Sequence, residues 1–348
     1  MDIKEALATV VERQDLSRES MRAVMQDVMT GKCTESQIGG FLVALRMKSE
    51  TIEEITAAVE VMRGLVTPVK VDVEPMIDIV GTGGDGANIF NVSTASAFVA
   101  AAAGAYVAKH GNRGVSSSSG SADVLESLGV GVGLPVPDVE RSISEMGLGF
   151  MFAPAHHSAM KHAIEARREL AMRTIFNILG PMTNPAGATR LLVGTFNQAL
   201  CRPMAEVLQK LGSERVMVVH AEDGLDEISL ATQTHVVEVN EEGISEYRLS
   251  PEQVGLQSQS LIGLEVDSPQ ASAALIKDAL GKRRGQNAEK AADMIALNAG
   301  AGVYVSGIAD SIAQGVELAR DMILSGLALE KIESLAAFTA VLQQKGDA

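Results

Sequence analysis

The sequence is poor in cysteine, in aromatic residues and in positive charge. Its 348 residues include two cysteines, Cys33 and Cys201, which fit neither a disulfide framework nor the spacing of a metal site. Tryptophan is absent and aromatic residues make up 3% of the chain, which argues against nucleic-acid binding by base stacking. Lys and Arg number 29 against 44 Asp and Glu, a net charge of −15, which excludes a broad basic surface for a nucleic acid or an anionic membrane. An anionic ligand must therefore be held locally, by backbone amides, a few cationic side chains or a metal ion.

The sequence also lacks a long hydrophobic run. The longest apolar stretch, residues 97–108, has 12 residues, fewer than the roughly 20 that cross a bilayer as a helix. The first residues do not show the basic-then-apolar order of a signal peptide, so we expect a cytoplasmic protein without a membrane partner. Apolar residues make up 46% and charged residues 21%, the balance of a globular protein, and the length predicts about two domains.

Residues 1–66 are predicted to form a small helical domain. Thr34 with Gln37, and Thr51 with Glu54, have the spacing of capping boxes, and each pair precedes apolar residues at helical spacing. A domain of about 65 residues in short helices buries little surface by itself. We therefore expect it to pack on the next domain or on a second subunit.

A second domain, residues 70–348, is expected to follow a hinge at residues 66–69. Short apolar runs alternate there with glycine-rich turns and helical stretches, which is typical of an α/β domain with a mainly parallel sheet. Ligands of such sheets bind beyond the carboxyl ends of the strands. The expected strands are 76–80, 106–108, 149–152, 215–220 and 235–239, and the expected helices are 93–103, 122–128, 158–169, 287–298 and 308–324.

The first informative strand end, residues 78–86, is rich in glycine. Glycines allow unusual backbone angles and a close approach of amides to a ligand. Beyond them Asn91, Ser93 or Thr94 could cap a helix whose N-terminus favours an anion. The glycines at 81, 83 and 86 also match the dinucleotide-binding fingerprint, but the helix begins about seven residues too late and a lysine stands where the ribose-binding carboxylate belongs. A purely structural turn is the alternative.

The second strand end, residues 109–121, combines cations with hydroxyl groups. Lys109 and Arg113 share this stretch with five serines, and no carboxylate appears before Asp123. Phosphate or diphosphate binding explains this composition, with Lys109 as a point charge and the hydroxyls as donors. A solvated polar loop is the alternative.

The third strand end, residues 220–227, is a turn rich in carboxylates. Mg²⁺ takes carboxylate ligands together with substrate phosphates. Next to two phosphate-binding loops, Asp226 and Glu227 could hold such ions. Alone, the same turn would be an ordinary acidic surface.

A helical segment, residues 156–168, carries histidines and arginines. We expect His157 and Lys161 to share one helix face, and Arg167 or Arg168 to offer a fork for a planar carboxylate, unless they form surface ion pairs. The histidines have no acidic or cysteine companions at ligand spacing, which argues against zinc.

Six motifs follow one another along the chain: Gly81-Thr-Gly-Gly-Asp85, Asn91-Val-Ser-Thr94, Lys109-His-Gly-Asn-Arg113, Gly120-Ser-Ala-Asp-Val-Leu-Glu126, Arg173-Thr-Ile-Phe-Asn-x-Leu-Gly-Pro181 and Asp223-Gly-Leu-Asp-Glu227. In this order and at these separations they resemble the anthranilate phosphoribosyltransferase family over nearly the whole chain. The resemblance implies a helical domain, joined in space by part of 165–185, and a large α/β domain. That α/β domain would be of the nucleoside-phosphorylase-like type of class III phosphoribosyltransferases. Such chains usually pair as homodimers through the helical domains.

The implied reaction joins anthranilate to 5-phosphoribosyl 1-diphosphate. It gives N-(5-phosphoribosyl)anthranilate and diphosphate in tryptophan biosynthesis. The resemblance makes Lys109, Asp226 and Glu227 catalytic, and it assigns two Mg²⁺ ions per subunit to Ser93, Asp226 and Glu227. It assigns anthranilate contacts to Gly81, Asn112 and Arg167. It assigns contacts with the diphosphate donor to Gly81, Gly84, Asp85, Ile89, Asn91, Val92, Ser93, Thr94, Lys109, His110, Gly111, Asn112, Arg113, Gly114, Val115, Ser116, Ser117 and Ser121.

Some positions depart from the family pattern. Ile89 stands where a threonine is common, so a side-chain hydrogen bond to the donor is lost. Glu165-Ala166 replaces a Gly-Pro or Pro-Val pair before Arg167, and Ala171 replaces a glycine. These changes concern the helix for the aromatic substrate and leave the phosphate and metal residues unchanged.

We expect a dissociative substitution at the anomeric carbon of the ribosyl group. Mg²⁺, Lys109 and loop amides would stabilise the leaving diphosphate. The amine of anthranilate is neutral near pH 7, so it needs positioning more than deprotonation, and His110 is a candidate to accept the proton afterwards.

Two other functions fit parts of the sequence. A pyrimidine-nucleoside phosphorylase would share the architecture, but Asp226 and Glu227 favour a metal-bound diphosphate, and phosphorolysis of thymidine or uridine would separate the two. A non-catalytic homologue that binds nucleic acid should be basic and have altered loops, so the acidic charge and intact loops argue against it. A gel-shift assay would test that alternative.

Overall fold

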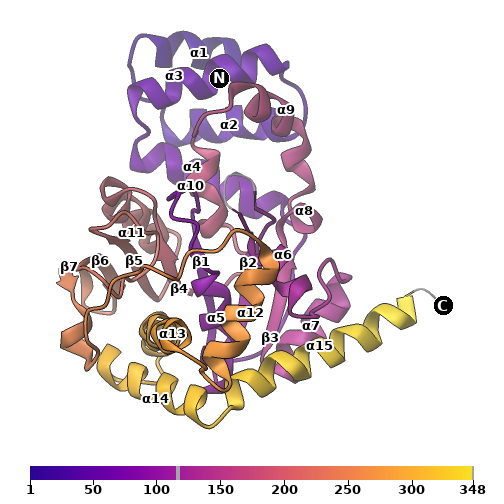
Figure 1. Ribbon diagram of the computed structural model, residues 1–348. Helices are drawn as coiled ribbons and strands as arrows, with labels where there is room; N and C mark the ends of the chain where they lie inside the picture. The colour runs from indigo at the N-terminus through magenta and orange to yellow at the C-terminus, as the bar shows by residue number, and fades with distance from the viewer. Residues whose placement is uncertain (115–117, 347–348) are drawn as a thin grey trace.

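The computed structural model describes residues 1–114 and 118–346. Val115, Ser116 and Ser117, which the resemblance assigns to the donor site, lie outside the described residues. The first helices, α1 (Ile3–Val11), α2 (Arg18–Met29), α3 (Glu35–Lys48) and α4 (Ile52–Leu65), form a helical layer at one end of the molecule. An α/β part built around a single sheet occupies the other end (Figure 1).

The expected capping boxes begin two of these helices. The Thr34 side chain accepts a hydrogen bond from the Gln37 backbone N–H, and the Gln37 side chain accepts one from the Thr34 backbone N–H. Thr51 and Glu54 form the same reciprocal pair at the start of α4. Each cap satisfies backbone donors that the helix itself leaves unpaired, which stabilises the helix start by about 1 kcal/mol.

The described residues form a seven-stranded sheet in the order β3-β2-β1-β4-β5-β6-β7. Strands β3, β2, β1, β4 and β5 pair in parallel, and β6 and β7 add antiparallel pairs at one edge, which confirms the mainly parallel sheet. The strands are β1 (Met76–Gly81), β2 (Tyr106–Gly111), β3 (Leu148–Phe152), β4 (Arg190–Gly194), β5 (Arg215–Ala221), β6 (Thr234–Asn240) and β7 (Gly243–Leu249).

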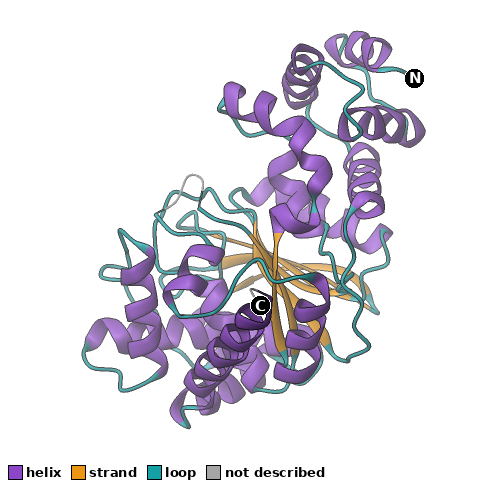
Figure 2. Cartoon of the chain, turned by 90° about the vertical axis from the view of Figure 1, so that its right-hand side faces the viewer, coloured by secondary structure: helices purple, strands orange, loops and turns teal. Residues whose placement is uncertain are grey.

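Helices cover both faces of this sheet (Figure 2). Ile77 and Ile79 of β1 pack into a core with α5 (Val92–Ala102) and α13 (Gln286–Ser306). Leu191 and Val193 of β4 face the opposite core, which holds α11 (Cys201–Lys210). Alternate residues of a strand point to opposite faces, so this pattern buries both. The other helices are α6 (Ser121–Ser127), α7 (Val136–Met146), α8 (Ala153–His156), α9 (Lys161–Leu170), α10 (Phe176–Leu179), α12 (Pro269–Leu280), α14 (Ile312–Leu324) and α15 (Leu327–Gly346), with 3-10 turns at Ser158–Met160, Gly180–Met182, Gln198–Leu200 and Pro251–Val254.

The helical layer shares one hydrophobic core with the second face of the sheet. Buried residues of α1 to α4, of α9 to α11 and of strands β4 to β6 belong to a single cluster. α4 packs on α11, and α9 packs on α2 and α3. The small helical layer therefore gains its buried surface from the α/β part of the same chain.

Several expected elements differ from the structure. β4 and β7 were not predicted, and α13 continues to Ser306 instead of ending at 298. Its glycines do not end the helix but permit close packing: a Cβ at Gly300 would lie 2.5 Å from the backbone N of Val316 in α14. α14 begins at Ile312 instead of 308, where the Ser311 side chain caps it.

The helix expected over 158–169 is also wrong in its first turn. His157 lies between α8 and a 3-10 turn, with φ −108° and ψ 55°, and α9 begins at Lys161. His157 and Lys161 therefore do not share one helix face. Within the described ranges, no helix is long and apolar enough to span a membrane.

Candidate active site

The candidate site lies at the ends of the neighbouring strands β1 and β4. After β1 the chain continues to β2 on one side of this pair, and after β4 it continues to β5 on the other side. Gly81 ends β1 and pairs with Gly194 at the end of β4. The turn that carries Asp226 lies directly on both glycines: a Cβ at Gly194 would be 1.5 Å from the Asp226 backbone oxygen, and a Cβ at Gly81 would be 2.6 Å from Asp226 Oδ2. Such a point of divergence is where open α/β sheets bind ligands.

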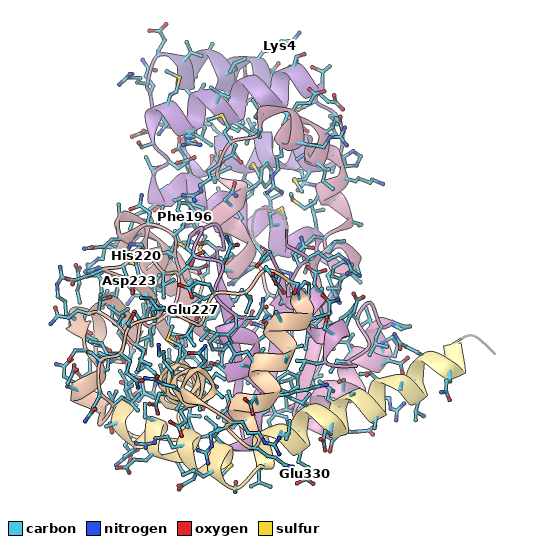
Figure 3. All side chains as sticks on the ribbon, in the orientation of Figure 1. Lys4, Phe196, His220, Asp223, Glu227 and Glu330 are labelled. Carbon is cyan, nitrogen blue, oxygen red and sulfur yellow. The ribbon has the colours of Figure 1, made fainter. Side chains whose placement is uncertain are left out.

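Asp226 and Glu227 are held by backbone amides of the surrounding loops. Gly83 N–H donates to Asp226 Oδ2 at 2.7 Å, and Ser93 N–H donates to Glu227 Oε1 at 3.0 Å. Burial raises the pKa of both carboxyl groups. The negative charge of Asp85 raises the pKa of Asp226 further, and the charge of Asp226 does the same for Glu227. Figure 3 shows Glu227 between the helical layer and α13.

This set of carboxylates fits Mg²⁺. Asp226, Glu227 and the nearby Asp85 repel one another in a recessed position, and a divalent cation offsets that repulsion. Across the described part of the chain, no three His, Cys, Asp or Glu side chains form a metal cage by themselves. Mg²⁺ usually binds through one or two carboxylates, substrate phosphates and water, so it needs no such cage.

Arg173 holds the glycine loop after β1 in place. Arg173 donates a hydrogen bond to the Gly84 carbonyl, and its guanidinium carbon lies 3.9 Å from the centre of the Phe196 ring. Gly84 has φ +81°, a left-handed conformation that favours glycine. Further along, Ile89 forms an isolated β-bridge with Glu265.

Asn91 connects the two loops that the sequence predicts to bind phosphate. Its Nδ2 donates to the Ser119 carbonyl at 3.1 Å, and its Oδ1 accepts hydrogen bonds from the hydroxyls of Ser119 and Ser272. Asn91 occupies the N-cap position of α5 without a side-chain cap bond. The expected cap is therefore absent at Asn91, because its side chain joins the loops instead.

The first turn of α5 holds the remaining residues of this motif. Val92 begins the helix, and Thr94 is buried with a hydroxyl that has no hydrogen-bond partner among the described residues. The Ser93 backbone N–H faces Glu227. The helix start thus presents backbone donors and a free hydroxyl next to the carboxylate pair.

Lys109 and His110, at the end of β2, are both buried. Lys109 Nζ donates to the Ile79 carbonyl at 2.6 Å, and burial lowers its pKa while Asp78 and Glu227 oppose that shift. Burial, with the neighbouring His157, lowers the pKa of His110 to about 3. A base with so low a pKa is weak, which argues against His110 as a proton acceptor.

The loop after β2 folds around the start of α6. Asp123 accepts hydrogen bonds from Gly114 N–H at 2.9 Å and Gly120 N–H at 3.0 Å. Arg113 pairs with Asp123 and Glu126, so these carboxylates neutralise its charge. The remaining residues pack closely: the Ser121 hydroxyl donates to the Asn112 carbonyl at 3.2 Å, and a Cβ at Gly111 would lie 2.2 Å from that hydroxyl oxygen.

Arg167 lies on α9, where its guanidinium carbon is 5.3 Å from the centre of the Phe176 ring. The guanidinium is half-buried and makes no ion pair or hydrogen bond with any described residue, and burial lowers its pKa. Its neighbour Arg168 pairs with Glu165 at the surface. Ala171, which caps the C-terminus of α9, has φ +46°, a left-handed conformation at the position where the family pattern has glycine.

The structure thus brings most predicted site residues together. The segments 81–94, 109–114 and 226–227 are linked by hydrogen bonds or by the electrostatic effect of one charged group on another, whereas Arg167 has no such link to them among the described residues. Four residues were missed as part of this site: Asp78, Arg173, Asn184 and Gly194. A charged residue inside the apolar strand run 76–80 was a signal for Asp78, and Arg173 begins one of the six motifs; the sequence holds no comparable signal for Asn184 and Gly194.

The chain matches two family descriptions over most of its length. Residues 4–65 match the helical bundle domain of a glycosyl transferase family, and residues 73–329 match the a/b domain of a glycosyl transferase family. Fold and family matches together therefore define a two-domain glycosyl transferase, whose candidate site lies at the strand ends.

Named relatives narrow this class. An anthranilate phosphoribosyltransferase of Cellvibrio japonicus is 65% identical over 99% of this chain and 100% of its own length. One of Ectopseudomonas mendocina is 60% identical over the full length of both chains. The crystal structure of the Thermus thermophilus enzyme has a TM-score of 0.90 at 43% identity, covering 96% of this chain and 99% of its own. The enzyme of Saccharomyces cerevisiae in complex with PRPP and Mg has a TM-score of 0.88 at 26% identity, covering 97% and 98%. The chain belongs to the anthranilate phosphoribosyltransferase family.

Proposed function

We propose that this site transfers the phosphoribosyl group of 5-phosphoribosyl 1-diphosphate to the amine of anthranilate, in tryptophan biosynthesis. One observation carries the proposal. Two strand-end loops, joined through Asn91, meet the carboxylates of Asp226 and Glu227 at the point where the sheet diverges. The Saccharomyces cerevisiae relative in complex with PRPP and Mg supports it.

The donor would bind along backbone amides and small side chains of the two loops. The free hydroxyl of Thr94 and the N-terminus of α5 offer hydrogen bonds to phosphate oxygens. Lys109, near the end of β2, contributes positive charge at the base of the two loops. Because these donors are fixed before the reaction, they stabilise charge that grows on the leaving diphosphate.

Asp226, Glu227 and Ser93 would hold two Mg²⁺ ions per subunit. When bound, Mg²⁺ supplies positive charge that stabilises the departing diphosphate. The Gly83 and Ser93 amides keep the two carboxylates oriented toward the donor loops.

Arg167 would bind the carboxylate of anthranilate. A half-buried guanidinium without an anionic partner carries an uncompensated desolvation cost, and a bound carboxylate offsets it. The side chains of Arg167 and Asn112, with the backbone at Gly81, would place the neutral amine for attack, so that no strong base is required.

Arg167→Ala is expected to raise the Michaelis constant for anthranilate. Loss of a charge-assisted hydrogen bond costs about 1.5–3 kcal/mol, which corresponds to roughly 10- to 100-fold in the constant. Steady-state kinetics at a saturating concentration of the donor measure this Michaelis constant. Arg168→Ala, which removes only the surface pair with Glu165, is the matched control. A fall in turnover without a change in this Michaelis constant would contradict the assignment.

The activity itself is tested by mixing the protein with anthranilate, the donor and Mg²⁺. We expect the fluorescence of anthranilate to fall as anthranilate is consumed, and one diphosphate to appear for each anthranilate consumed. Thymidine with inorganic phosphate serves as the second substrate pair. Phosphorolysis of thymidine, with anthranilate unchanged, would overturn the proposal.

We further propose that two copies of the chain pair through the helical layer. A groove of about 670 Å³ lies between α1, α3 and α9, lined by apolar and small residues such as Leu7, Gly40 and Ala166. At its edge Val11 and Met47 are 61% and 67% exposed. A second copy of the same helices would bury these side chains, which favours association.

Replacing Val43 and Met47 by glutamate is expected to produce a monomer. Both residues line the groove, and four like charges would meet across a symmetric interface. Sedimentation velocity should give the mass of one chain for this variant and of two chains for the parent. Ile262→Glu alters another exposed apolar residue on a loop that does not line the groove, and should leave the dimer intact. A parent protein that sediments as a monomer would contradict the pairing.

The domain limits, 1–66 and 70–348 with part of 165–185 beside the first, are part of the same proposal. The packing of α9 on α2 and α3 supports them. The cytoplasmic location stays a prediction from the sequence.

A further inference from the structure

Asp78 is a fully buried carboxylate in the central strand β1. It lies between Ile77 and Ile79, which face the opposite core, and it is 0% exposed. Its Oδ1 accepts a hydrogen bond from His110 N–H at 3.2 Å, and its Oδ2 accepts one from Asn184 Nδ2 at 2.7 Å. Both carboxylate oxygens are therefore used inside the protein, away from the proposed ligands.

These hydrogen bonds occur where the backbone pairing of β1 with β2 has ended. The paired register of the two strands stops at Ile77 and Val107. Beyond it, Asp78 takes the His110 N–H and Lys109 Nζ donates to the Ile79 carbonyl at 2.6 Å. Side chains thus bridge the strand ends in place of the sheet ladder, and the start of the 109–114 loop depends on them.

Asn184 extends this bridge to the connection between the domains. Its Nδ2 also donates to the Ala108 carbonyl at 2.9 Å, and its Oδ1 accepts from Ala186 N–H at 2.8 Å. The next residue, Pro185, accepts a hydrogen bond from Val69 N–H at 3.0 Å. The segment 184–186, which is hydrogen-bonded to the hinge at Val69, therefore also holds the Asp78 carboxylate.

The negative charges of two carboxylates, Asp78 and Glu227, act on the ammonium group of Lys109. Both favour its charged form against the effect of burial. In a setting of low dielectric a cation moves toward the carboxylate that remains when the other is removed. Without the charge of Asp78, the ammonium of Lys109 would pair with Glu227, and Glu227 would lose its availability to metal and donor.

We propose that Asp78 and Asn184 are positioning residues that hold Lys109 and the start of the 109–114 loop in the geometry that receives the diphosphate donor. This inference rests on the proposed function. Both act through other residues of the chain: Asp78 accepts from the His110 N–H, and Asn184 donates to Asp78 and to the Ala108 carbonyl just before Lys109. The donor side of the reaction depends on them most, because Lys109 and the start of the loop face the donor, whereas Arg167, which would bind the anthranilate carboxylate, lies on α9 outside this link.

Asp78→Asn tests the inference, because it removes the charge and keeps the shape. We expect the Michaelis constant for the donor to rise about 10-fold or more, as for loss of one charge-assisted hydrogen bond. The Michaelis constant for anthranilate should stay within about twofold, which is well below the loss of one such bond. Titration calorimetry of the donor with Mg²⁺, without anthranilate, should show the same weakening. Asn184→Ala should shift donor binding in the same direction and provides the measurement if Asp78→Asn does not fold.

Glu54→Gln is the matched control. Glu54 is also 0% exposed and pairs with a buried lysine, Lys48 Nζ at 2.9 Å, while accepting Leu16 N–H at 2.9 Å. This pair joins α3 to α4 within the helical layer and does not involve the donor loops. Its loss should lower the melting temperature without a selective change in donor binding.

The inference fails if a folded Asp78→Asn or Asn184→Ala protein binds the donor as the parent does. It also fails if both Michaelis constants change in parallel, as a general loss of stability would cause. Absence of turnover in the parent protein would instead reject the proposed function, so the two failures are distinguishable.

Discussion

Replacing Asp226 by Asn and Glu227 by Gln is expected to lower turnover by about a thousandfold or more, since each tenfold step corresponds to about 1.4 kcal/mol of lost transition-state stabilisation. The variant keeps the size of both side chains but loses the two charges beside Gly83 and Ser93. Its rate should no longer rise with Mg²⁺ in the range where the parent saturates. Initial rates over a Mg²⁺ titration measure both effects.

Glu222→Gln is the control for this double variant. Glu222 precedes the same turn but pairs with Arg248 at the surface, so its replacement should leave turnover and Mg²⁺ dependence unchanged. Parent-like kinetics in the Asp226 and Glu227 variant would reject these residues as the metal site.

Gly194→Ala is expected to lower turnover by about 100-fold, as misplacement of a site by about 1 Å does. The added Cβ would lie 1.5 Å from the Asp226 backbone oxygen, so the turn that carries both carboxylates must move. Binding of the donor with Mg²⁺ should weaken together with turnover. Kinetics and calorimetry on the purified variant measure the two.

Gly64→Ala is the control, because it also adds a methyl group but brings it into contact with no other atom. A Cβ at Gly64 in α4 meets no atom within 4 Å, and alanine favours a helix over glycine by roughly 0.5–1 kcal/mol. This variant should be slightly more stable and fully active. An active Gly194→Ala protein would show that the contact between β4 and the Asp226 turn does not position the site.

The fold class could be predicted from the sequence because helix starts and strand ends are marked by residues close together in the chain. Thr34 and Thr51 satisfy helix donors within four residues, and strand ends are marked by glycines, so these elements need no distant partner to be recognised. β7 was missed because its exposed Ser245, Glu246 and Arg248 give it little apolar character. β4 was missed although its apolar run, residues 191–193, is as long as the predicted strand 106–108, so run length alone does not identify a buried strand. α13 was cut short because its glycines serve packing against α14, which only the tertiary structure shows.

The site was predicted in part for a similar reason. Motifs along the chain indicated the loops and the carboxylates of Asp226 and Glu227. Contacts between distant segments could not be predicted, such as the approach of Gly194 to Asp226 or the link from Asp78 to Asn184. The ion pairs of Arg113 with Asp123 and Glu126 are a further contact that the sequence did not indicate, and the donor contact assigned to Arg113 stays a prediction.

A crystal structure of the protein with 5-phosphoribosyl 1-diphosphate and Mg²⁺ would locate the donor and the metal. We expect diphosphate density between the 81–94 loop and the 109–114 loop, with metal density against Asp226 and Glu227. Diphosphate bound elsewhere, or metal that leaves both carboxylates without contact, would contradict this expectation.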